Sequence, residues 1–240
     1  EAGRALVLWG ALQVDLMRRS PDEAERVAAD DLLGLLTPVI KGYLTDKGFK
    51  AAVEAQQVFG GHGYIREHGM EQFVRDARIT QIYEGTNGIQ AMDLVGRKLP
   101  KDGGRAVQSF FKLLSTEFAD FSEIEELKPL LGHFSEAIGD LQAATMWLAQ
   151  NGPADPDHAG AGAYAYMELM GLVSLGWMWL KMAASSNRLK DEPGEDRAFH
   201  ETKLATARFY AQRELVGAGA LRQKVEAGAE AVMALPVDAF

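Results

Sequence analysis

Apolar residues recur every three to four positions along most of the chain, the spacing of one buried face of an α-helix. The pattern predicts a helix over residues 4–19 and a second helix that passes through Leu32 and ends near Val58. Ser20 precedes a proline and is expected to be the N-cap of that second helix, which Pro38 could bend. Shorter helices are expected at about residues 70–78 and 86–99.

The sequence Pro100–Gly104 is typical of a linker, and we expect a domain boundary there. Four helices are predicted after it, with apolar positions spaced over residues 107–121, 130–148, 161–185 and 204–218. The third is apolar around most of its circumference and should be the most buried. We therefore predict an all-α fold with one helical domain over residues 1–99 and a second helical bundle over residues 105–240.

Composition narrows the kinds of partner. Of the 240 residues, 47% are hydrophobic and 25% are charged, which is typical of a globular protein. The formal net charge of −9 argues against nucleic acid or an anionic membrane surface as a partner. The chain has no Cys, which fits a cytoplasmic protein, and the apolar run at residues 169–180 is too short to span a membrane. The chain begins at Glu1 within a helical pattern, which suggests a fragment of a longer protein.

The candidate catalytic and ligand-binding residues lie between residues 57 and 90. Glu84 follows apolar residues, is followed by Gly85, and precedes a predicted helix start, so it is a candidate general base. On the pattern alone, a glutamate in the middle of a loop is usually just a solvated surface carboxylate, and that interpretation stays open. The turn Gly61-His62-Gly63 is either a helix end or a place where a phosphate approaches the backbone closely. It is not a Rossmann fingerprint, because a helix precedes it and Arg66 occupies the last glycine position.

Other catalytic patterns are missing from the sequence. The five His residues show no spacing typical of a metal site, and we expect no bound metal. There is no nucleophile elbow and no Walker loop.

Two motifs carry a resemblance to a known family. QVFGGHGY at residues 57–64 and RDARITQIYEGT at residues 75–86 resemble the C-terminal helical domain of acyl-CoA dehydrogenases, over roughly residues 1–99. YEGTNGIQAMDLVGRKL at residues 83–99, followed by further helices, resembles the subset with an extra C-terminal helical domain, which includes 3-methylmercaptopropionyl-CoA dehydrogenases.

The resemblance implies an FAD-dependent oxidoreductase that desaturates an acyl-CoA thioester between its α and β carbons. Glu84 would be the base that removes the α-proton, and the β-hydrogen would leave as hydride to the flavin. Gln57, Gly60, Gly61 and Thr86 would contact FAD, and Tyr83 and Gly85 would line the thioester end of the substrate site. Many members of the family have Gln where this chain has Gly88, so one contact to the cofactor is not carried over.

The resemblance also sets expectations for partners and for the isolated chain. An electron-transfer flavoprotein is the expected electron acceptor, and a homodimer is the expected assembly. The N-terminal helical domain and the central β-domain of the family are missing, so we expect the isolated chain to be inactive and to bind FAD weakly or not at all. The alternatives are an acyl-CoA dehydrogenase-like flavoprotein with another reaction and, for residues 105–240, a helical oligomerisation module.

Overall fold

The computed structural model describes residues 1–239, and all secondary structure in that range is helical. The α-helices are α1 (Ala2–Arg19), α2 (Glu23–Val58), α3 (Gly61–Tyr64), α4 (Met70–Ile79), α5 (Asn87–Asp93), α6 (Arg105–Ser122), α7 (Lys128–Asn151), α8 (Pro156–Leu189), α9 (Arg197–Arg213) and α10 (Ala218–Glu226). Short helical turns are η1 (Arg66–His68), η2 (Leu94–Lys98), η3 (Lys101–Gly104), η4 (Glu125–Leu127), η5 (Leu215–Gly217) and η6 (Val237–Ala239), of which η2 is a π-helix. The predicted all-α fold is confirmed. Within residues 1–239, no helix is both long and apolar enough to cross a bilayer.

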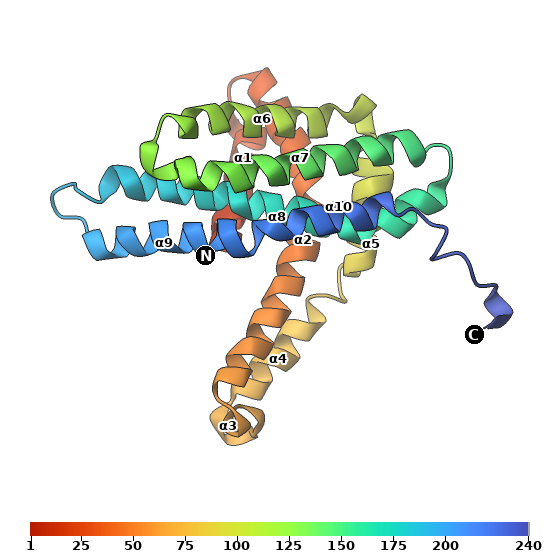
Figure 1. Cartoon of the computed structure of the whole chain (residues 1–240), viewed down its shortest axis with the longest axis horizontal. Coiled ribbons are helices and arrows are strands. Elements are labelled where there is room, and N and C mark those ends of the chain that lie inside the picture. The colour runs from red at the N-terminus through yellow and green to blue at the C-terminus, as the bar shows by residue number, and fades with distance from the viewer. Residues whose placement is uncertain (240) are drawn as a thin grey trace.

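The helices form a body from which a narrow arm projects (Figure 1). Helices α6 to α10 run alongside one another in the body, and α1 and the first half of α2 pack against them. The second half of α2 leaves the body, α3 forms the tip, and α4 returns beside α2. We call residues 46–79 the arm. Helix α5 lies at the base of the arm, where the chain re-enters the body.

Helix α8 is the centre of the hydrophobic core, as its sequence pattern predicted. Most of its residues between 162 and 180 are buried. The Trp177 ring meets Trp9 of α1 at 5.0 Å and Phe110 of α6 at 6.0 Å, both edge-on, which are favourable aromatic geometries. One hydrophobic cluster therefore contains residues from both sides of Pro100–Gly104. The division into two domains stays a prediction.

Helices α2 and α8 approach closely at two glycines. A Cβ atom added to Gly171 of α8 would lie 2.3 Å from the ring of Tyr43 of α2. A Cβ atom added to Gly42 of α2 would lie 2.4 Å from the sulfur of Met167 of α8. Each helix thus places a large side chain over a glycine of the other, and this fixes how the two helices cross.

Two predicted helix boundaries are wrong. The N-cap of α2 is Asp22, whose carboxylate accepts from the Ala24 N–H at 2.9 Å, whereas the Ser20 hydroxyl oxygen accepts from the Asp22 N–H. The last long helix is interrupted between Arg213 and Ala218, so the second half of the chain has five α-helices rather than four. The break lets the buried Leu215 side chain turn toward α8.

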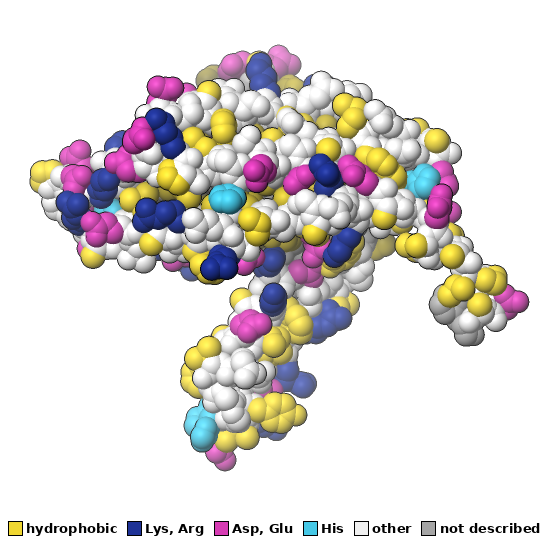
Figure 2. Space-filling model, viewed as in Figure 1, with side chains coloured by type: hydrophobic (Ala, Val, Ile, Leu, Met, Phe, Trp, Pro, Cys, Tyr) yellow, Lys and Arg dark blue, Asp and Glu magenta, His cyan; other side chains and the backbone are white. Residues whose placement is uncertain are grey.

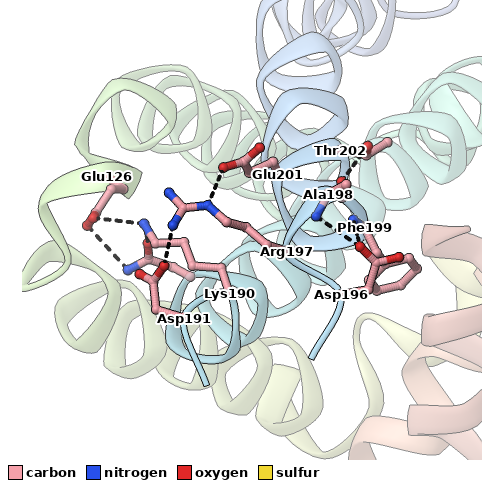
Figure 3. Close-up of polar contacts among 10 residues, drawn as sticks. Glu126, Lys190, Asp191, Asp196, Arg197, Ala198, Phe199, Glu201 and Thr202 are labelled. Carbon is pink, nitrogen blue, oxygen red and sulfur yellow. Dashed lines mark hydrogen bonds and ion pairs between the residues drawn. The ribbon is translucent and has the colours of Figure 1, made fainter. Parts of the chain in front are cut away.

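Charged side chains fix the connection from α8 to α9 (Figure 3). Asp196 caps α9 by accepting from two backbone N–H groups. The Arg197 guanidinium donates to Asp191 in the connecting loop at 2.8 Å. Lys190, at the end of α8, donates to Glu126 of η4 at 3.2 Å. These contacts lie on the body, far along the chain from the Glu84 region.

Candidate active site

Glu84 lies on the short loop between α4 and α5, at the base of the arm. Its φ of 54° is in the left-handed region, and Gly85 follows with a φ of 82°. A left-handed conformation costs a residue with a Cβ atom about 1–2 kcal/mol. Such strain persists only where surrounding contacts determine the backbone, and it is concentrated at functional sites.

Hydrogen bonds close the loop and hold its carbonyl groups. The Asn87 N–H donates to the Gln81 carbonyl at 3.1 Å and so joins the two ends of the loop. The Gln90 side chain donates to the Glu84 carbonyl at 3.1 Å. The Lys41 ammonium, from α2, donates to the Gly85 carbonyl at 2.7 Å. The two left-handed residues are therefore fixed from both the α2 and the α5 side.

Asp46 of α2 is the centre of a polar cluster behind the loop. One of its carboxylate oxygens accepts from the Gln81 amide at 2.6 Å and from the Asn87 amide at 2.7 Å. The other accepts from the hydroxyl of Tyr164, which lies on α8. The buried Asn87 amide also donates to the Gly42 carbonyl at 3.0 Å. Burial, together with the hydrogen bond to Asp46, raises the pKa of Tyr164, so this hydroxyl keeps its proton and remains a donor.

A cavity of about 480 Å³ opens between the arm and the body next to this cluster. Its walls are formed by residues of the arm, the loop, α5 and α8: Asp46, Phe49, Arg78, Gln81, Ile82, Thr86, Asn87, Gly88 and Tyr164. Thr86 is the N-cap residue of α5, but its hydroxyl makes no capping hydrogen bond. It is therefore available to a ligand.

The Glu84 carboxylate is exposed, as are Ile82 and Tyr83 beside it. The apolar surroundings that the sequence suggested for this carboxylate are thus not supplied by residues 1–239. The rest of any enclosure has to come from another surface.

The predicted site residues fall into two groups. Tyr83, Glu84, Gly85 and Thr86 lie together on the loop, whereas Gln57, Gly60 and Gly61 lie at the tip of the arm. Helix α4 has 10 residues, which corresponds to about 15 Å of rise, and it separates the groups. At the tip, Gly60 has a φ of 57°, and a Cβ atom added to Gly60 or Gly61 would meet nothing within 4 Å. The backbone there is open to a ligand.

Sequence reasoning missed the residues that hold the loop from outside it, namely Lys41, Asp46, Gln90 and Tyr164. Each is a polar residue within a predicted helix, and nothing in the local sequence distinguishes it from an ordinary surface position. No spacing in the sequence connects Asp46 with Tyr164, which are 118 positions apart.

Two family models match the chain. "Acyl-CoA dehydrogenase, C-terminal domain" matches residues 17–99, and "Acetyl-CoA dehydrogenase C-terminal like" matches residues 107–236. The chain is 34% identical over 226 residues to 3-methylmercaptopropionyl-CoA dehydrogenase of Ruegeria pomeroyi, covering 94% of this chain and 38% of that protein. It is 31% identical to the broad-specificity linear acyl-CoA dehydrogenase FadE5 of Mycobacterium tuberculosis, covering 86% and 35% of the two chains.

Structure comparison gives the same fold. The crystal structure of Caenorhabditis elegans ACDH-11 in complex with C11-CoA matches with a TM-score of 0.76 and 20% identity, over 96% of this chain and 37% of that one. The chain thus spans between a third and two fifths of the length of these relatives.

The fold and the loop define a set of helices that presents the exposed Glu84 carboxylate on a strained loop at the base of an arm. The chain belongs to the acyl-CoA dehydrogenase family, and its two halves match the C-terminal helical regions of that family.

Proposed function

We propose that this chain is the base-carrying helical part of an FAD-dependent acyl-CoA dehydrogenase, in which Glu84 removes the α-proton of an acyl-CoA thioester. The observation that carries the proposal is the left-handed Glu84, which is fixed by contacts to its own carbonyl and to its neighbour's. Strain of this kind is concentrated at functional sites, and here it is supported by contacts from both α2 and α5. The names of the relatives, all acyl-CoA dehydrogenases, support the same reaction.

The α-proton of a thioester is weakly acidic, so a carboxylate removes it only if the developing enolate is stabilised. Among residues 1–239, the Glu84 N–H has no hydrogen-bond acceptor, which leaves it free to donate to a thioester carbonyl. A carboxylate also becomes a stronger base when water is excluded from it. Because Glu84 is exposed here, we infer that this desolvation comes from the substrate and from protein outside residues 1–239.

The residues present fit a flavin dinucleotide at two places. The open, left-handed backbone at Gly60 and the unobstructed Gly61 would let a pyrophosphate approach, with the exposed Gln57 side chain beside them. The Thr86 hydroxyl, which makes no capping hydrogen bond to α5, would bind FAD near the base. When bound there, FAD would supply the acceptor for the β-hydrogen.

The separation of the two groups by α4 favours a dimer. We infer that the loop and the arm tip of one copy serve different flavins, because the two groups lie at opposite ends of the arm. Each flavin would then contact the loop of one copy and the arm tip of the other. The arm also exposes large apolar side chains, including Val58, Tyr64 and Phe73, and apolar surface is visible along it in Figure 2. Exposed apolar surface of this kind is typical of a protein interface. The homodimer, and electron-transfer flavoprotein as the electron acceptor, are part of the proposal.

Because Glu84 and the arm tip are both exposed in this chain, we propose that the isolated chain is inactive and binds FAD weakly or not at all. Titration of the 240-residue chain with FAD, followed by flavin fluorescence, tests this directly. Tight binding, or turnover of an acyl-CoA by this chain alone, would contradict it.

The reaction itself is tested on the protein that carries this chain together with the remaining domains of an acyl-CoA dehydrogenase. The purified flavoprotein is mixed anaerobically with saturated acyl-CoAs of several lengths while the flavin absorbance is followed. We expect rapid bleaching with at least one thioester, and loss of bleaching in Glu84→Gln. Bound flavin that no acyl-CoA bleaches would refute the proposed reaction.

A further inference from the structure

Tyr164 connects the second half of the chain to the Glu84 loop. It lies on α8, beyond Pro100–Gly104, and its hydroxyl donates to Asp46 of α2. The other oxygen of Asp46 accepts from Gln81 and Asn87, the residues three positions before and three positions after Glu84. A single carboxylate therefore fixes both ends of the loop and is itself fixed from α8.

The position of Asp46 depends on its donors. An ionised carboxylate accepts hydrogen bonds and donates none, so its orientation is determined by the donors around it. Gln81 lies in the loop and Asn87 is the first residue of α5 directly after it, whereas Tyr164 lies on α8 in the body. The Tyr164 hydroxyl thus gives Asp46 a hydrogen-bond donor that is not part of the loop.

We propose that Tyr164 is a positioning residue for Glu84, acting through Asp46 to hold the loop in its strained conformation. The inference rests on the proposed function of Glu84 for its catalytic consequence. It assigns the added C-terminal helices a part in placing the base, because α8 supplies the hydroxyl.

The Tyr164 hydroxyl can be removed without disturbing the packing of its ring. The side chain is 39% exposed, so removal of its hydroxyl leaves no buried cavity and the Tyr164→Phe variant keeps the ring packing. A matched control lies two positions further along α8. The buried Tyr166 hydroxyl forms its hydrogen bond with Thr145 of α7, at 2.7 Å, rather than with Asp46 or the loop.

Hydrogen exchange of the 240-residue chain tests the positioning role without relying on catalysis. Mass spectrometry would follow the peptide over residues 80–90, which contains the Asn87 N–H that closes the loop. We expect Tyr164→Phe to speed exchange in this peptide about threefold to tenfold, the range that follows from loss of one ordinary hydrogen bond. Tyr166→Phe should leave the peptide unchanged. Equal exchange in wild type and Tyr164→Phe, or equal acceleration in both variants, would overturn the proposal.

Flavin reduction by an acyl-CoA in the complete flavoprotein tests the catalytic consequence. We expect Tyr164→Phe to lower the rate constant at saturating thioester about threefold to tenfold, because the base is displaced. KM should change less than about twofold, because substrate binding is unaffected. Tyr166→Phe should reduce flavin at the wild-type rate. A wild-type rate in Tyr164→Phe would overturn the proposal. If the wild-type flavoprotein reduces no flavin, the proposed reaction fails, and the exchange result still decides whether Tyr164 controls the loop.

Discussion

Substitution of Gly171 by alanine tests whether the Tyr43 ring of α2 fills the space over this glycine of α8. The added Cβ atom would lie 2.3, 2.4 and 2.8 Å from three ring atoms of Tyr43, far inside van der Waals contact. Tyr43 is buried and its ring is rigid, so it cannot bend away as the Met167 side chain over Gly42 can. Either α8 moves away from α2 or the Tyr43 ring leaves its position.

The magnitude follows from two opposing effects. Overpacking of a filled core costs about 1–3 kcal/mol. Replacement of a glycine inside a helix by alanine contributes about 0.5–1 kcal/mol in the opposite direction. Because the contact is with a rigid ring, we take the upper part of the first range and expect Gly171→Ala to lower the free energy of unfolding by about 1–2 kcal/mol.

Gly139 provides the control. It lies inside α7, is exposed, and a Cβ atom added there would meet nothing within 4 Å. Gly139→Ala should therefore raise the free energy of unfolding by about 0.5–1 kcal/mol. Urea denaturation followed by circular dichroism measures both variants. Equal stability of the two variants would refute the reasoning, because it would mean that Tyr43 does not occupy the space over Gly171.

Further predictions concern an ion pair and the loop. The Asp31 carboxylate is buried and accepts two hydrogen bonds from Arg105, at 2.6 and 2.8 Å, which lower its pKa; its stabilising contribution is therefore present above the unfolded pKa near 4 and is lost as the pH falls through the lower folded value. Asp31→Asn should lower the free energy of unfolding at pH 7 by about 1.5–3 kcal/mol. The free energy of unfolding of the variant should also fall less between pH 7 and pH 3 than that of wild type, and urea denaturation at the two pH values measures both effects. The exposed Asp15 carboxylate lies 3.8 Å from Arg19, and Asp15→Asn should change the free energy of unfolding by less than about 0.5 kcal/mol. A similar loss of stability in both variants would contradict a special stabilising role for the Asp31–Arg105 pair. Glu84→Gly should raise the free energy of unfolding by up to about 1 kcal/mol, since glycine adopts the left-handed φ without strain, and a lower stability in the same denaturation assay would argue against strain at this residue.

Periodicity in the sequence was sufficient for most helices, because each amphipathic helix shows its buried face locally. The apolar stretch of α8 and the residues that precede Glu84 were recognised in this way. The N-cap of α2 was misplaced because Ser20 and Asp22 are both good caps, and only the geometry decides between their hydrogen bonds. The break after Arg213 was missed because apolar residues continue across it in helical register.

The candidate site was only partly visible in the sequence. Its motif residues are close together along the chain, so a local pattern identified Glu84. Asp46 and Tyr164 meet only because α2 and α8 cross where glycines allow it, and such a crossing leaves no local signal. The role of Glu84 as the base, those of Tyr83 and Gly85 toward the substrate, those of Gln57, Gly60, Gly61 and Thr86 toward FAD, and the domain boundary at residues 100–104 remain predictions.

The continuous core also changes how residues 105–240 should be studied. Deletion of this segment would expose the faces of α1, α2 and α5 that α8 covers. A change in association after deletion would therefore not separate an oligomerisation role from loss of folding. Single substitutions such as Tyr164→Phe preserve the core and are the sharper probe.

The most direct test of the central claim is whether Glu84 exchanges the α-hydrogen of a bound thioester. The complete flavoprotein would be incubated in D₂O with an acyl-CoA, and deuterium at the α-carbon would be measured by mass spectrometry. Glu67→Gln serves as the control, because Glu67 is an exposed glutamate between α3 and α4, at the other end of α4 from Glu84. We expect α-deuteration by wild type and Glu67→Gln, and a decrease of at least about 100-fold in Glu84→Gln, as for loss of a catalytic base. Undiminished α-deuteration by Glu84→Gln would show that another group is the base.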